Sequence, residues 1–149
     1  MDAGADLEAR TSWIGWTPLL YAAMYNENPE VVQVLLDAGA DVEGRSEYGW
    51  TPLLLAVRYN TNPEVVQALL DAGADLEARD EDGSTPLLLA ARYNTNPEMV
   101  QVLLDAGADL EARSTEYGNT PLIFATRYNT NPEVVQALLD AGAELEARS

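Results

Sequence analysis

The tripeptide Thr-Pro-Leu occurs four times, and most of the sequence that follows it is copied each time. The copies begin at Thr17, Thr51, Thr85 and Thr120, with spacings of 34, 34 and 35 residues. Spacings of this size are typical of proteins built from stacked structural repeats. One short unit cannot bury its own apolar face, so neighbouring units have to stack. The sequence therefore predicts a curved, all-α solenoid.

Each repeat carries the start signals of two short helices. Thr17 is a helix-capping residue, and Pro18 follows it at the first helical position, where proline is favoured. Asn28 and Pro29 provide the same pair of signals for a second helix. Gly39 then stands where a left-handed residue commonly ends a helix. We expect a helix pair in every repeat, with a turn-rich loop between one pair and the next.

Composition and charge exclude several classes of function. The chain has 25 acidic residues against 8 basic ones, a net charge of −17, so it would repel the phosphates of nucleic acids and anionic membranes. Histidine, lysine and cysteine are absent, which removes the usual general bases and the amine and thiol nucleophiles. The acidic segment 80–83 lacks the ligand spacing of a calcium loop. We expect no enzymatic activity, no cofactor, no bound metal, no nucleic-acid partner and no membrane partner.

The sequence gives little information about location. No apolar run is long enough to span a membrane, and the N-terminus lacks the basic and apolar regions of a signal peptide. We expect a soluble protein, cytoplasmic if it is expressed inside a cell.

The repeat unit resembles the ankyrin repeat. The resemblance rests on Gly-X-Thr-Pro-Leu, the Ala-rich helix after it, Val-Val-Gln-X-Leu-Leu and Gly-Ala-Asp-Leu-Glu-Ala-Arg. It covers essentially the whole chain and implies helix pairs joined by β-turn or hairpin loops. The expected organisation is a single domain, 1–149, with an N-terminal half-repeat at 1–10 and repeats at about 11–44, 45–78, 79–112 and 113–149. The copies are so alike that an engineered, consensus-type array is favoured over a natural one.

The positions at which the copies differ are candidates for function, because the shared positions already account for the fold. Aromatic side chains stand in the loops before three of the Thr-Pro-Leu segments, whereas the third copy has a polar turn at 80–84. In ankyrin repeats, these loops and the first helices form a concave surface that binds other proteins. Aromatic residues are also enriched at interface hot spots. The candidate partner-binding residues are Trp13, Ile14, Trp16, Tyr21, Met24, Tyr25, Tyr48, Trp50, Arg58, Arg92, Tyr117 and Phe124.

We expect a folded protein partner, with the tryptophans entering apolar pockets and Arg58 and Arg92 at the rim. The acidic charge would steer a basic partner toward the chain. Other interpretations remain open. The aromatic residues could brace an uncapped first repeat, and the tyrosines that recur in every copy are expected to pack between repeats. A scaffold without a target, an array that self-associates and a natural microbial effector are the alternative functions.

Overall fold

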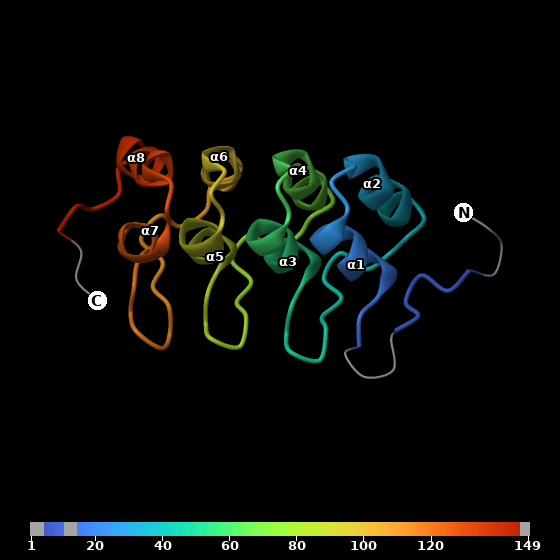
Figure 1. Cartoon of the computed structure of the whole chain (residues 1–149). Helices are drawn as coiled ribbons and strands as arrows, with labels where there is room; N and C mark the ends of the chain where they lie inside the picture. Colours follow the sequence, from blue (N-terminus) through green and yellow to red (C-terminus); the bar gives the residue numbers. More distant parts are fainter. Residues whose placement is uncertain (1–4, 11–14, 147–149) are drawn as a thin grey trace.

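The computed structural model describes residues 5–10 and 15–146, and it consists of four helix pairs in a row (Figure 1). No strand occurs in these ranges, which confirms the all-α prediction. None of the helices found there has the length and apolar character needed to cross a bilayer. The helices are α1 (Pro18–Tyr25), α2 (Pro29–Asp37), α3 (Pro52–Tyr59), α4 (Pro63–Asp71), α5 (Pro86–Tyr93), α6 (Pro97–Asp105), α7 (Pro121–Tyr128) and α8 (Pro132–Asp140).

The helix boundaries follow from the predicted capping residues. The Thr17 hydroxyl accepts a hydrogen bond from the Leu20 N–H at 3.3 Å, and Pro18 begins α1. The Asn28 side chain accepts from the Glu30 N–H at 3.0 Å at the start of α2. Both bonds satisfy N–H groups that have no partner within the first turn of a helix. These caps recur in every pair, so each copy of the sequence folds in the same way locally.

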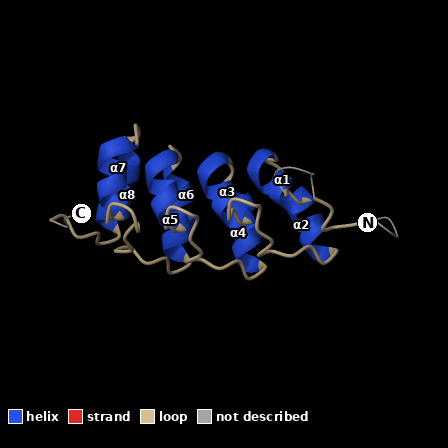
Figure 2. Cartoon of the chain, turned by 90° about the horizontal axis from the view of Figure 1, so that it is seen from below, coloured by secondary structure: helices blue, strands red, loops and turns tan. Residues whose placement is uncertain are grey.

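The helices form two layers. The first helices of the pairs, α1, α3, α5 and α7, pack side by side, and the second helices form the other layer (Figures 1 and 2). Apolar side chains between neighbouring helices are fully buried, and burial of a leucine or valine stabilises the fold by about 1.5–3 kcal/mol. The central pairs contribute Leu53, Leu54, Val57, Val65, Val66, Leu69, Leu87, Ala90, Met99, Val100 and Leu103 to this core.

A ladder of asparagine side chains also connects the repeats. The Asn60 side-chain amide donates to the carbonyls of Ala23 and Asn26 in the preceding pair, both at 2.9 Å. Asn94 and Asn129 make the same two bonds to the pairs before them. The accepting carbonyls lie at the ends of the first helices, where no intrahelical N–H is available. Each asparagine therefore fixes the position of its repeat on the neighbouring one.

The loops carry two further ladders. Arg45 donates to the Gly49 carbonyl at 2.7 Å and to the Arg79 carbonyl of the next repeat at 3.0 Å. Glu43 accepts from the Asp75 N–H of the next repeat at 3.0 Å. Equivalent bonds recur along the array, so the recurrent arginines and acids of the loops have a structural role.

We expect Asn94→Asp to destabilise the protein by about 2–3 kcal/mol, because it removes two donors at a buried site and leaves two carbonyls unpaired. The matched control is Asn26→Asp, since the Asn26 side-chain amide donates to no carbonyl in the described part of the chain. Urea unfolding followed by circular dichroism measures both. An equal loss of unfolding free energy in the two variants would show that the hydrogen bonds between repeats do not explain the effect of Asn94→Asp.

Candidate protein-binding surface

The residues that differ between repeats lie mainly on one side of the array. This side, called the inner face below, is made by α1, α3, α5 and α7 and by the loop that precedes each of them (Figure 1). The loops before α3, α5 and α7 project away from the layer of second helices, on the side of the first helices. No acidic residue stands in the first turn of any of these four helices.

An aromatic cluster occupies the N-terminal end of the inner face. The Trp16 ring centroid lies 5.0 Å from that of Tyr21 and 6.4 Å from that of Tyr25, and the two tyrosines stack at 6.4 Å. Residues 21 and 25 are four apart on α1, which places them on one helical face. Tyr25 is 68% exposed and Tyr21 is 36% exposed, while Met24 beside them is half-buried. The cluster is therefore an accessible apolar surface.

Trp50 differs from Trp16 although both directly precede Thr-Pro-Leu. Its side chain packs against the buried core, and its ring lies 6.4 Å from that of Tyr59 and under the guanidinium of Arg58 at 5.5 Å. Only part of Trp50 is therefore available to a partner. Tyr48, at the tip of the same loop, is 55% exposed.

The remaining candidates are spread along the chain. Trp13 and Ile14 lie outside the described residues. Tyr117 is exposed, and a hydrogen bond to Glu116, together with the charge of that carboxylate, raises the pKa of its phenol. Phe124 is only 2% exposed and lies beneath Arg92. Phe124 can therefore support a binding surface, but it has little area of its own to offer a partner.

The preceding repeat explains why equivalent residues differ in exposure. Tyr21 and Phe124 occupy the same position in their repeats, but Arg92 of the preceding pair covers the Phe124 ring at 5.3 Å. No described helix pair precedes α1, so nothing equivalent covers Tyr21. Burial of this position therefore depends on the neighbouring repeat as well as on the residue.

Arginine and tyrosine alternate along the rest of the inner face. The Arg58 guanidinium carbon lies 4.1 Å from the Tyr93 ring centre, and that of Arg92 lies 4.4 Å from the Tyr128 ring centre. Each arginine therefore packs on a tyrosine of the next repeat. These tyrosines were expected to pack between repeats, but their place on an exposed surface was not predicted. The recurrent dipeptide Arg-Tyr was the available signal, at Arg58, Arg92 and Arg127.

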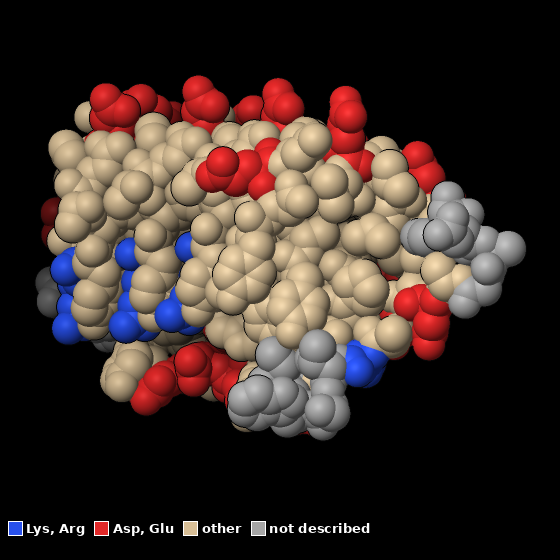
Figure 3. Space-filling view, turned by 45° about the vertical axis from the view of Figure 1, so that its right-hand side comes forward, with Lys and Arg blue, Asp and Glu red and all other residues tan. Residues whose placement is uncertain are grey.

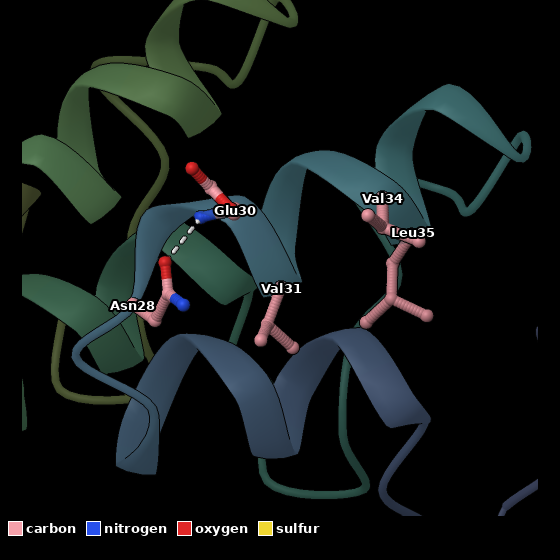
Figure 4. Close-up of a pocket in the computed structure, with 5 residues that line it drawn as sticks. All are labelled: Asn28, Glu30, Val31, Val34 and Leu35. Atoms are coloured by element: carbon pink, nitrogen blue, oxygen red, sulfur yellow. Dashed lines mark hydrogen bonds between the residues drawn. The ribbon is translucent and has the colours of Figure 1, made fainter.

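Another hollow lies elsewhere, on α2. It has a volume of about 440 Å³ and is lined by Asn28, Glu30, Val31, Val34 and Leu35 (Figure 4). Val31 and Val34 are exposed there, whereas Leu35 is partly buried against the core. Val31 is 37% exposed, whereas the equivalent Val65, covered by α2, is fully buried. The hollow is thus the open end of the helix stack, and we do not assign it to the binding surface.

A smaller hollow adjoins the aromatic cluster. It has a volume of about 250 Å³ and is lined by Ala9, Arg10, Trp16, Pro18 and Tyr21. Its place beside Trp16 and Tyr21 gives the cluster a concave edge that an apolar side chain of a partner could enter. Its volume lies below the range of about 300–1,000 Å³ that is typical of small-molecule sites.

The acidic loop segment has a structural use. The Asp80 carboxylate accepts hydrogen bonds from the N–H groups of Asp82 and Ser84, at 3.0 and 2.9 Å. Its lone pairs thus stabilise the turn. Among the described residues, no group of three acidic side chains is arranged to hold a metal ion.

We expect Phe124→Ala to destabilise the protein by about 3–5 kcal/mol, because the buried ring leaves a cavity under Arg92. Tyr117→Ala, in the loop before the same helix, should change stability by less than about 0.5 kcal/mol because the ring is exposed. Urea unfolding of both variants separates a supporting residue from a surface residue. If the Phe124 variant were as stable as the Tyr117 variant, the assignment of Phe124 as a support would be wrong.

Comparison with known proteins identifies the repeat. A family model described as ankyrin repeats (three copies) matches residues 1–80 and, a second time, residues 61–149. The two matches together span the whole chain, with four helix pairs in the described part. No curated protein matches the sequence. The repeats and the helix pairs agree with the family match, and the chain belongs to the ankyrin repeat family.

Proposed function

We propose that this protein is a non-catalytic recognition module that binds a folded protein partner through the aromatic end of its inner face. Ankyrin repeats are generally protein–protein interaction modules. The observation that carries the proposal is the cluster of Trp16, Tyr21 and Tyr25, in which three aromatic rings are in contact, the two tyrosines are exposed and Trp16 is half-buried. Exposed apolar clusters are unfavourable in a free monomer, and tryptophan and tyrosine dominate interface hot spots.

The candidate residues have different roles in this proposal. Trp16 and the two tyrosines form the centre of the interface, with Met24 between them and the arginines. Tyr48 and Trp50 flank the centre from the next loop, and Trp13 and Ile14 precede Trp16 in the sequence. Arg58 and Arg92 supply polar contacts along the rim. Tyr117 and Phe124 lie two repeats or more away, so they belong to the interface only when the partner is long.

The similarity of the copies also supports a proposal about origin. A consensus-type design would keep the scaffold constant and change only the loops and first helices, which is where most of the large differences lie. A natural effector with the same binding mode is the alternative, and the function proposed here is the same in both cases.

Two other functions remain. The aromatic residues could mainly brace the first repeat, and the packing of Trp50 against the core favours such a role for that residue. Self-association is the other, because the open end at α2 exposes Val31 and Val34. Sedimentation of the purified chain distinguishes a monomer from an array that assembles with itself.

The proposal is tested by changing single exposed rings. The partner is first identified by capture from an extract, using as reference a variant in which residues 46–50 carry the Asp-Glu-Asp-Gly-Ser sequence of 80–84. Trp16→Ala should then weaken the affinity for that partner by about 2–4 kcal/mol, the usual effect of removing a hot-spot residue. Tyr25→Ala should also weaken binding. Surface plasmon resonance measures affinity, and thermal melting by circular dichroism checks the fold.

Tyr117→Ala is the control, because it removes an exposed aromatic ring far from the cluster. It should have the smaller effect on affinity. If Trp16→Ala instead lowers the melting temperature strongly and affinity barely changes, the rings brace the repeat and the proposal is wrong.

A further inference from the structure

The arginines in the described part of the chain form two groups. Those in the loops donate hydrogen bonds to backbone carbonyls, as Arg10, Arg45 and Arg79 do. The arginines of the inner face contact only aromatic rings: no hydrogen bond or ion pair to another described residue is made by Arg58, Arg92 or Arg127. This group is called the arginine band below.

The absence of acidic partners is unexpected in this chain. Its 25 acidic residues outnumber its 8 arginines about threefold, yet none of those described lies within ion-pairing distance of the band. The Nε of Arg92 is buried without a hydrogen-bond partner. A donor of this kind costs free energy unless some acceptor reaches it. The guanidinium groups of the band therefore have no carboxylate partner among the described residues.

Ring stacking holds the guanidinium groups in a fixed row. Tyr93 lies between two of them, 4.1 Å from the Arg58 guanidinium carbon and 4.9 Å from that of Arg92. Tyr128 lies between Arg92 and Arg127 in the same way, at 4.4 and 5.1 Å. Stacking occupies the flat faces of a guanidinium and leaves its N–H edge available, the edge that binds a carboxylate with two parallel hydrogen bonds.

The surroundings of the band restrict what can bind there. Figure 3 shows arginine gathered on one face of the array, with acidic side chains above and below it. Exposed acids in the loops, such as Glu81, and at the starts of the second helices, such as Glu64, carry this negative charge. A long polyanion would have to pass close to these margins. A short acidic segment that lies along the band would stay away from these acidic margins.

We propose that the arginine band binds a short acidic segment of a protein partner, whose carboxylates pair with Arg58, Arg92 and Arg127. Two neighbouring guanidinium carbons lie no farther apart than the sum of their distances to the tyrosine ring that they share. This upper limit fits an extended segment. An extended chain advances about 3.3 Å per residue, so acids two or three residues apart match neighbouring arginines.

Met24 replaces the arginine in the first repeat, so the cationic row ends where the aromatic cluster begins. The expected ligand therefore has an apolar anchor at one end and acids along the rest. This inference rests on the proposed function, because it assigns a partner chemistry to the same inner face.

A random twelve-residue peptide library displayed on phage tests the proposal without a known partner. It is selected on the immobilised full chain and, in parallel, on Arg58→Gln/Arg92→Gln/Arg127→Gln and on the single variant Arg127→Gln. The control is Arg45→Gln, which removes the same charge from a loop ladder. Circular dichroism confirms that each variant is folded; if the triple variant is not, Arg127→Gln carries the comparison, because its side chain is exposed.

Peptides selected on the unchanged chain and on Arg45→Gln should be enriched in Asp and Glu beside an aromatic or aliphatic residue. The enrichment in acids should be lost on the triple variant and reduced on Arg127→Gln. In a synthetic copy of a selected peptide, each Glu→Gln change should weaken binding by up to about fivefold, with a smaller effect at high salt.

Selected peptides without acidic enrichment, or equal enrichment on the triple variant, would overturn the proposal. So would a single-stranded RNA probe that binds the band more tightly than the selected acidic peptides. A parallel selection on Trp16→Ala separates the proposal of the aromatic centre from that of the arginine band. If the peptides selected on this variant lose the apolar residue but keep the acids, both proposals are supported. Acids lost on the arginine variants while Trp16→Ala changes nothing would support the band and contradict the aromatic centre.

Discussion

The stacking of each helix pair on the next is the constraint on which the rest of the structure depends. Apolar residues between neighbours supply most of the free energy, and the asparagine ladder at Asn60, Asn94 and Asn129 sets the register. Because the same bonds recur in every repeat, the first helices lie in parallel at a constant spacing. Because of this spacing, residues at equivalent positions of successive repeats line up in rows on one face.

The fold could be predicted almost completely from the sequence. Thr17, Asn28 and their copies cap helices as expected, since a cap depends only on residues within one turn. The ladders were not predicted. A bond such as that from Arg45 to the carbonyl of Arg79 joins residues a whole repeat apart, and nothing local marks it. The recurrent loop residues had no predicted role, although they join the repeats.

The candidate site could be predicted only in part. Comparing the copies located the aromatic residues on α1, which the structure brings together with Trp16. It could not determine which rings are exposed, because the preceding repeat decides this: Phe124 is covered by Arg92, and Tyr21 is not covered. Arg58 and Arg92 were expected at the rim of the interface, but the row that they form with Arg127 was not predicted. Recurrence indicated packing, and only the arrangement in space shows cations without acidic partners.

The central claim is that a partner contacts the aromatic end of the inner face, and hydroxyl-radical footprinting of the complex tests it most directly. The oxidation rates of individual tryptophan and tyrosine side chains are compared in the free and bound protein by mass spectrometry. The account predicts strong protection of Trp16, Tyr21 and Tyr25. Unchanged oxidation of these three rings in the bound protein, with protection confined to the second helices around Val31 and Val34, would contradict it.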